Sequence, residues 1–380
     1  MSSTKRPGSA SPLVPGTPLP IRSRWRGVAG AAAALLLAAC TQTNPDYCVE
    51  SPECVDLASP SPGADLGAGA NDDLGGADLA GKPGDGAVSS PFDPSKPGTS
   101  NIVVFDLPVQ VSMRSQVSTT VIGPSEDSLE ISRRGPFPVV VISPGFTLDR
   151  KLFQSYGERL ASYGIIAVLQ KSGSEFNHTQ YRDETVALLD WLVSPTGRGA
   201  ERLMGRVDKS RIGLAGHSLG GKISLLVAER DPRVKALFLI DPVDAGTPQA
   251  RTDLGRIKLP AGVPMLYVGE TISKMGGFMP CTPADSNYEV LYDRSPAPAV
   301  AITVKEAAHN DFVDNFMSCG TCGFCPGGTA PKDRTNKLAV KYSTAYFLWA
   351  LGGERRGADY LTGAEFQKDV TAGYVGSVKK

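Results

Sequence analysis

Short apolar runs alternate with amphipathic segments from about residue 101 onward. Residues 138–142 form a continuous apolar run rich in β-branched side chains, as a strand covered on both faces of a parallel sheet requires, and Leu152, Tyr156 and Leu160 then recur at helical spacing. The same alternation predicts strands at residues 164–169, 211–215, 234–240, 263–268 and 300–304, and helices at 182–192, after 218 and at 337–351. We therefore predict an α/β domain with a mostly parallel central sheet and helices on both faces.

The first hundred residues differ from this domain in charge and composition. The 380-residue chain has 39 basic and 39 acidic side chains, but residues 1–40 carry five basic and no acidic groups, whereas residues 41–100 carry two basic and ten acidic ones. The second segment contains 17 glycines and prolines and two aromatic residues, too little apolar surface to offset the entropy lost on ordering. We predict a disordered tether at 41–100 and a folded domain at 101–380, in which residues 101–133 supply antiparallel edge strands.

The N-terminal segment has the features of an export signal. Arg22, Arg24 and Arg26 precede the apolar residues 28–39, a run too short to span a bilayer as a helix. The sequence Leu-Ala-Ala-Cys that ends at Cys40 resembles the lipobox of bacterial lipoproteins, in which the cysteine is lipidated. We predict that residues 1–40 are a lipoprotein signal peptide and that Cys40 anchors an exported protein in the cell envelope. An ordinary signal peptide and a single-pass anchor are the alternatives.

The motif Gly216-His217-Ser218-Leu219-Gly220 is the first candidate for chemistry. A Gly-x-Ser-x-Gly string alone is weak evidence, but here it follows an apolar strand and opens an apolar helix, the setting of a nucleophile elbow. Side chains at positions 216 and 220 would collide with the neighbouring strand and helix, so both positions require glycine. We predict that Ser218 is a catalytic nucleophile. A phosphate-binding turn is disfavoured, because the motif lacks the Lys-Ser/Thr ending of a P-loop.

A serine hydroxyl needs a base to remove its proton, and the chain has three histidines. His217 lies beside the nucleophile, and we expect it to face away from the cleft as a packing and hydrogen-bonding residue. His178 precedes the serine in the chain and is placed before the helix at 182–192, whereas enzymes with this elbow have the order serine, acid, histidine. His309 follows the last predicted strand and is therefore our candidate general base.

The acid that orients the base has three candidates. Asp241 and Asp244 follow the strand at 234–240, and Glu270 follows the strand at 263–268. Asp241 stands directly at its strand end, where the backbone is rigid and Pro242 stiffens the exit. The residues alone therefore favour Asp241 over Glu270, and Glu270 over Asp244, without excluding any of them.

A serine that attacks a carbonyl carbon also needs hydrogen-bond donors for the oxyanion that forms during the reaction. We expect these donors to be the backbone N–H groups of Leu219, after the nucleophile, and of Phe146, in the loop after the strand at 138–142. Gly145 allows that loop to turn close to the substrate carbonyl.

The remaining cysteines favour disulfides. Three of them, at 319, 322 and 325, have a spacing that also occurs in zinc and iron–sulfur sites, but an exported chain favours oxidised pairs. We expect Cys48 to pair with Cys54, and Cys281 to pair with one member of the 319–325 cluster and so brace the loop that carries His309. No metal and no cofactor is expected.

At this point the sequence resembles known families. Residues 142–147 and 162–164, together with the elbow, are similar to the cutinase-like polyester hydrolases and dienelactone-hydrolase relatives. The second half resembles the chlorophyllases, on residues 216–222, 240–244, 281–284, 287–288 and 308–311. The resemblance covers roughly residues 135–350 and implies an α/β-hydrolase fold.

The resemblance also bears on the acid and the substrate. Chlorophyllases and the similar platelet-activating-factor acetylhydrolases place the acid at the end of the strand after the elbow helix, which corresponds to Asp241. This chain departs from chlorophyllases at Leu219, where they usually carry Arg, and at Pro144, where they carry His. It lacks the Trp that polyester hydrolases place near Asp241 and their Asp beyond Glu270. The resemblance therefore implies ester hydrolysis and leaves the ester open.

These features together predict a serine carboxylic-ester hydrolase with the triad Ser218, His309 and Asp241. The short connection from 241 to 263 leaves no room for a large cap, so we expect an open cleft that accepts a hydrophobic small-molecule or polymeric ester. The absence of net charge gives no reason to expect a nucleic acid partner. We expect a monomer. The alternatives are a lipid-anchored binding protein without catalysis and a cutinase-like polyester or lipid-ester hydrolase.

Overall fold

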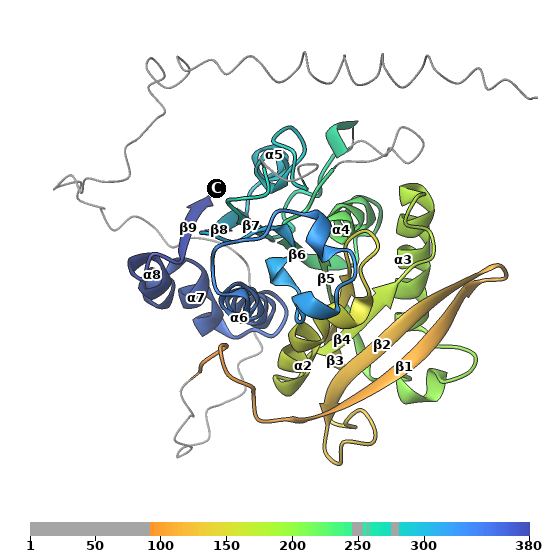
Figure 1. The fold of residues 1–380 in the computed structure, drawn as a ribbon. Coiled ribbons are helices and arrows are strands. Elements are labelled where there is room, and N and C mark those ends of the chain that lie inside the picture. The colour runs from red at the N-terminus through yellow and green to blue at the C-terminus, as the bar shows by residue number, and fades with distance from the viewer. Residues whose placement is uncertain (1–91, 245–253, 257, 275–280) are drawn as a thin grey trace, which may run out of the picture. The chain divides into compact units, whose positions relative to one another are not determined.

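A computed structural model describes residues 92–244, 254–256, 258–274 and 281–380. A nine-stranded sheet in the order β1-β2-β4-β3-β5-β6-β7-β8-β9 lies at their centre (Figure 1). The strands are β1 (Asn101–Ser112), β2 (Ser115–Ser125), β3 (Phe137–Ser143), β4 (Ile166–Lys171), β5 (Val207–His217), β6 (Val234–Ile240), β7 (Met265–Glu270), β8 (Ala299–Val304) and β9 (Val375–Lys379). Strands β3 to β8 pair in parallel, and β1, β2 and β9 pair antiparallel. The predicted mostly parallel sheet, with antiparallel strands at its N-terminal edge, is confirmed.

Each central strand contributes to two separate hydrophobic cores, which explains its continuous apolar sequence. In β3, Val139 and Val141 point into one core, whereas Val140 and Ile142 point into the other. Because successive side chains of a strand point to opposite faces, a sheet covered on both sides needs apolar residues at every position.

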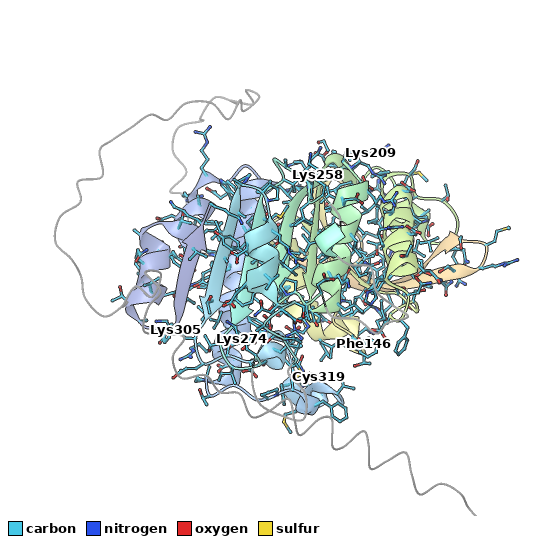
Figure 2. The ribbon with its side chains drawn as sticks, turned by 90° about the horizontal axis from the view of Figure 1, so that it is seen from above. Phe146, Lys209, Lys258, Lys274, Lys305 and Cys319 are labelled. Carbon is cyan, nitrogen blue, oxygen red and sulfur yellow. A yellow bond between two sulfur atoms is a disulfide. The ribbon has the colours of Figure 1, made fainter. Side chains whose placement is uncertain are left out.

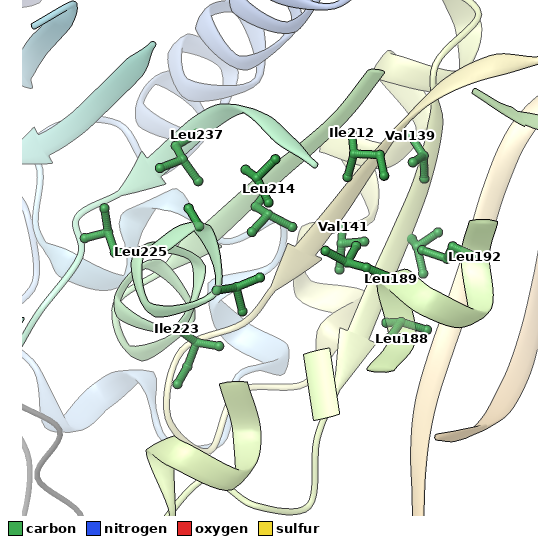
Figure 3. Packing of buried hydrophobic residues seen from close by; sticks show 14 of the residues in the cluster. Val139, Val141, Leu188, Leu189, Leu192, Ile212, Leu214, Ile223, Leu225 and Leu237 are labelled. Atoms are coloured by element: carbon green, nitrogen blue, oxygen red, sulfur yellow. The ribbon is translucent and has the colours of Figure 1, made fainter. Parts of the chain in front are cut away.

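Helices cover both faces, as predicted. On one face, α3 (His178–Val193) and α4 (Leu219–Arg230) pack against β3, β5 and β6, and Leu188 and Leu189 share one hydrophobic core with Val141 and Leu214 (Figure 3). Helix α5 (Tyr288–Arg294) contributes to the same core. On the other face lie α2 (Gln154–Ser162), α6 (Lys332–Ala350), α7 (Asp359–Thr362) and α8 (Ala364–Thr371).

Several predicted boundaries differ from the observed ones. Helix α3 begins at His178 rather than at 182, because the Asn177 side chain accepts a hydrogen bond from the backbone N–H of Gln180 and caps the helix there. His178 is therefore the first residue of the helix and does not precede it. Strand β5 is longer than predicted because it continues to Val207, which pairs with β3 beyond a register shift.

Three parts of the fold were not predicted. Helix α5 lies between β7 and β8, where the sequence analysis predicts no helix. The chain after α6 adds α7, α8 and β9, an edge strand in which only Val375 is buried. The folded part also starts before residue 101, because the Phe92 ring packs edge-on against Tyr163 and Tyr360 and its carbonyl accepts the Tyr360 hydroxyl. Residues 92–100 thus join the domain and do not belong to the tether.

Other predictions fall outside the described residues. Cys40, the signal segment, most of the tether and the pair Cys48 and Cys54 lie there, as do residues 245–253 of the connection that we expected to lack a cap. In the part of the chain that the structure describes, none of the helices combines the length and the apolar character needed to cross a membrane.

The carboxyl ends of the parallel strands share one edge of the sheet. Figure 2 places Phe146, Lys274 and Cys319, from the loops after β3, β7 and β8, along that edge, and Lys209 and Lys258 at the opposite one. Ligands of open α/β sheets bind at the carboxyl edge of the strands. The loops that follow β3, β5, β6, β7 and β8 therefore converge where a site is expected.

Candidate active site

Ser218 occupies a strained turn between β5 and α4. Its backbone has φ 53° and ψ −117°, a conformation that L residues rarely adopt, and its N–H donates to the Ile240 carbonyl at 3.0 Å. A Cβ on Gly216 would come within 2.2 Å of the Gly220 backbone, and one on Gly220 within 2.1 Å of the Ser143 carbonyl oxygen. The two glycines are required by close packing, as predicted for a nucleophile elbow. Ser218 is partly exposed, whereas the residues around it are buried.

His309 and Asp241 meet in the loops after β8 and β6. The His309 Nδ1 atom lies 2.6 Å from the Asp241 Oδ2 atom, and both side chains are buried. Asp241 has φ 42°, and its N–H donates to the Val268 carbonyl at 2.7 Å. Backbone strain in a non-glycine residue is retained where the surrounding structure determines it. The structure thus brings together two of the three residues predicted for a triad and aims an acceptor at the imidazole.

Burial shifts the pKa values of both His309 and Asp241. It lowers the pKa of His309 to about 4, with a smaller opposing effect from Glu270. Burial also raises the pKa of Asp241 well above its ordinary value, while Lys274 opposes that shift. The hydrogen bond between the two side chains stabilises the carboxylate against the cost of burial. An imidazole that is neutral near pH 7 can accept a proton, as a general base must.

Glu270 makes different contacts from those of Asp241. Its carboxylate accepts the backbone N–H groups of Ile272 and Ser273, the latter at 2.8 Å, and the Thr282 hydroxyl at 2.8 Å. The Ser273 hydroxyl in turn accepts the backbone N–H of His309 at 2.8 Å. Burial and then the nearby Asp241 raise the pKa of Glu270. Glu270 therefore supports the loop against which the His309 backbone rests.

Asp244, the third acid candidate, is paired elsewhere. Its Oδ1 atom lies 2.7 Å from the ammonium of Lys222, which is fully buried in α4. Its Oδ2 atom accepts the backbone N–H of Leu254 at 3.1 Å. This buried ion pair joins the elbow helix to the loop that follows Asp241.

His217 is closer to the base than the sequence suggested. Its Nε2–H donates to the His309 carbonyl at 2.8 Å, and the centroids of the two rings lie 4.5 Å apart. Burial holds the pKa of His217 well below its ordinary value, so the ring is neutral. The ring is buried, as expected for a packing and hydrogen-bonding residue, but its contact with the base was not predicted. No spacing in the sequence signals this contact between residues 92 positions apart.

His178, the remaining histidine, makes no such contact. Its ring is buried at the start of α3, and its Nδ1 atom has no hydrogen-bond partner among the described residues. Burial, followed by the charge of Lys222, lowers the pKa of His178 to about 4. Its side chain is a neutral packing residue.

The loop after β3 passes directly beside the serine. A Cβ on Gly145 would lie 3.2 Å from the Ser218 Cβ and 2.8 Å from the His217 Nδ1, so glycine is required here for close approach. Phe146 follows and is 43% exposed, and Phe176 packs edge-on against it at 5.0 Å between ring centroids. Leu219 is the first residue of α4. The two residues predicted to supply oxyanion donors thus both adjoin the Ser218 turn.

Two disulfides brace the loop after β8. Cys281 pairs with Cys325, as predicted for one member of the cluster, and Cys319 pairs with Cys322. The Asn310 side chain donates to the Cys322 carbonyl at 3.2 Å, which connects this loop to the residue after His309. Among the described residues no group of three or more His, Cys, Asp or Glu side chains is arranged to hold a metal ion.

Comparison with known proteins gives a consistent result. Residues 109–252 match a family model described as PETase, PET hydrolase-like. The chain is 31% identical over 177 residues to the bis(hydroxyethyl) terephthalate hydrolase of Streptomyces coelicolor, covering 45% of this chain and 56% of that one. It is 26% identical over 252 residues to Chlorophyllase-1 of Arabidopsis thaliana, which covers 58% of this chain and 74% of the chlorophyllase. It is 29% identical over 107 residues to Cutinase 2 of Thermobifida cellulosilytica, which covers 28% of this chain and 40% of the cutinase.

These matches confirm the resemblance to both groups of hydrolases. The match to Chlorophyllase-1 covers more residues, and the match to the terephthalate ester hydrolase has the higher sequence identity. The chain spans between 40% and 74% of the length of these three relatives.

Proposed function

Because the chain has a mostly parallel sheet consistent with an α/β-hydrolase fold and is similar to named ester hydrolases, we propose that it is a serine carboxylic-ester hydrolase that uses Ser218, His309 and Asp241. The observation that carries this proposal is the 2.6 Å contact between His309 and Asp241, at the sheet edge where Ser218 stands on its strained turn. The names of the relatives, a terephthalate ester hydrolase, a chlorophyllase and a cutinase, support the same chemistry.

In the proposed acylation step, the Ser218 Oγ attacks the ester carbonyl carbon while the His309 Nε2 accepts the hydroxyl proton. The Nδ1–H of His309 donates to Asp241, which fixes the tautomer and stabilises the imidazolium. The carbonyl oxygen becomes an oxyanion that accepts hydrogen bonds from the backbone N–H groups of Phe146 and Leu219. The tetrahedral intermediate then breaks its bond to the alcohol oxygen, which takes the proton from His309 and leaves an acyl-enzyme.

Deacylation repeats these steps with water. His309 removes a proton from a water molecule, whose oxygen attacks the acyl carbon and forms a second tetrahedral intermediate. This intermediate releases the carboxylic acid, and the Ser218 oxygen recovers its proton from His309. The buried imidazole, with its lowered pKa, is neutral at the start of each half-reaction.

We propose a hydrophobic ester as the substrate. Phe146 and Phe176, which are 43% and 66% exposed, present apolar surface at the loop that adjoins Ser218. The longer match, to Chlorophyllase-1, favours a chlorophyllase-like ester. The relative with the higher sequence identity, the terephthalate ester hydrolase, favours the second candidate, a cutinase-like polyester or lipid ester. Hydrolysis of p-nitrophenyl esters of graded chain length, a chlorophyll and a polyester film under the same conditions distinguishes these classes.

Exchange of the nucleophile tests the reaction itself. Ser218→Ala should lower the turnover number by about six orders of magnitude, leaving what binding and oxyanion stabilisation supply. Undiminished ester hydrolysis by the purified variant would refute the assignment. A folded wild-type protein that hydrolyses none of the esters would favour a binding protein on a hydrolase fold.

The location of the protein is a separate proposal, supported by the sequence alone. We propose that lipidated Cys40 anchors the protein in the bacterial cell envelope after export. Cys40→Ser should release an active protein from the membrane fraction, because the proposed site lies entirely in the residues after 101. A variant that stays with the membrane fraction would contradict lipid anchoring through Cys40.

A further inference from the structure

The loop that carries Phe146 is held by two charged side chains that the proposed mechanism does not use. The backbone N–H of Thr147 donates to the Glu175 carboxylate at 2.9 Å. The Lys171 ammonium donates to the same carboxylate at 2.5 Å and to the Leu148 carbonyl at 2.7 Å. One carboxylate and one ammonium thus bind two peptide groups, 146–147 and 148–149, just after the predicted oxyanion donor.

The backbone at this point needs such support. Thr147 has φ 62°, a left-handed conformation that costs free energy in a residue with a branched side chain. The side chains of Lys171 and Glu175 are 24% and 16% exposed, so solvent screens their charges less than those of an exposed pair. A hydrogen bond to an ionised acceptor is stronger than one between neutral groups.

We propose that Glu175, held by Lys171, is a positioning residue that fixes the Phe146 N–H for the oxyanion. This inference rests on the proposed function. Glu175 acts through the Thr147 peptide, which adjoins Phe146, and touches neither Ser218 nor the reacting atoms. An oxyanion donor stabilises the transition state when it is aimed at the oxygen before the reaction begins, so loosening its loop lowers the rate of the chemical step.

The neighbouring Phe176 provides an internal comparison. It belongs to the same β4–α3 connection and contacts the same loop, but it does so through its ring, which packs on the Phe146 side chain. An apolar contact at the rim of the site binds the ester in its ground state and its transition state alike. Loss of the Phe176 ring should therefore raise KM, whereas loss of the Glu175 carboxylate should lower kcat.

Steady-state kinetics of the full chain with a p-nitrophenyl ester test the proposal. We expect Glu175→Ala to lower kcat at least tenfold with KM changed less than twofold, and Glu175→Gln to recover part of the loss, because its amide oxygen still accepts the Thr147 N–H. Lys171→Met should also lower kcat, as Glu175→Ala does. Phe176→Ala should instead raise KM.

The matched control is Lys337→Met. Lys337 and Asp333 form an ion pair with the same four-residue spacing, but it lies on α6 and is largely exposed, at 74% and 68% of the two side chains. This variant should keep wild-type kinetics. A kcat of Glu175→Ala within twofold of the wild type, or an increase in KM alone, would overturn the positioning role even if Ser218→Ala abolishes activity.

A second measurement does not depend on catalysis. Hydrogen exchange of the peptide covering residues 144–149 should be faster in Glu175→Ala than in the wild type and unchanged in Lys337→Met. If the wild type hydrolyses no ester, the proposed function fails, but faster exchange would still establish that Glu175 holds this loop. Equal exchange in all three proteins would show that it does not.

Discussion

The His309 Nδ1 atom lies 2.6 Å from the Asp241 Oδ2 atom, although 68 positions separate the two residues in the chain. They meet because Asp241 follows β6 and His309 follows β8, and both strands end at the same edge of a parallel sheet. Ser218 reaches that edge from β5, the strand next to β6. The topology of the sheet therefore converts three distant positions into one candidate site.

Substitution of the two carboxylates distinguishes Asp241 from Glu270 as the acid of the proposed triad. Asp241→Asn places an amide where the imidazole needs an acceptor, so we expect turnover near neutral pH to fall by about four orders of magnitude with the fold intact. Glu270→Gln should lower turnover far less and chiefly reduce the free energy of unfolding, by about 1–3 kcal/mol, because it disturbs hydrogen bonds to a buried turn. Parallel kinetics and urea unfolding measure both effects, and the reverse ranking of the two kcat values would assign the acid to Glu270.

The second prediction concerns the pH at which kcat/KM declines on the acid side of its pH profile. Because burial lowers the pKa of His309 to about 4, its neutral, basic form should persist down to that pH, and kcat/KM should decline only as the pH falls through about 4. This decline describes the coupled His309 and Asp241 pair rather than either group alone. Its midpoint follows from kcat/KM measured between pH 3.5 and 8. A midpoint at or above the ordinary histidine value of about 6.5 would show that burial does not control the base.

The contact between His217 and His309 yields a third prediction. His217→Phe keeps an aromatic ring against the base but removes the donor to the buried His309 carbonyl, so we expect a loss of about 1–3 kcal/mol in unfolding free energy. Turnover should also fall, because the loop that carries the base loses a restraint. His217→Gln retains a donor and should recover part of both losses. Equal stability and turnover in the wild type and His217→Phe would mean that this hydrogen bond contributes nothing.

The disulfides should differ in their contributions to stability. Cys281 and Cys325 are 44 positions apart and Cys319 and Cys322 are three apart, and in the chain-entropy account a longer closed loop stabilises more. We expect the Cys281→Ser/Cys325→Ser variant to lose about 2–4 kcal/mol of unfolding free energy, and Cys319→Ser/Cys322→Ser to lose less. Chemical denaturation of the two double variants gives the comparison. A larger loss from the shorter loop would show that local contacts, such as the one from Asn310, outweigh chain entropy.

The sequence predicts the parts of this fold whose cause is local. The continuous apolar runs identify the central strands because burial on both faces requires them, and the glycines at 216 and 220 identify the elbow because nothing larger fits. Strand β9 was missed because an edge strand with one buried residue lacks an apolar pattern. The sequence predicts a hydrogen-bonding role for His217 but not its partner His309, and it does not predict the role of Glu175, because contacts between distant loops leave no periodic signal in the chain.

The central claim is that Ser218 is a nucleophile activated by His309 and Asp241. Its most direct test is to treat the purified protein with a fluorophosphonate, digest it and locate the adduct by mass spectrometry, since such a probe labels only an activated serine. We expect one phosphonyl adduct, on Ser218, which disappears in Ser218→Ala and forms much more slowly in Asp241→Asn. A folded wild-type protein that acquires no adduct on Ser218, or acquires one at another residue, would contradict this account.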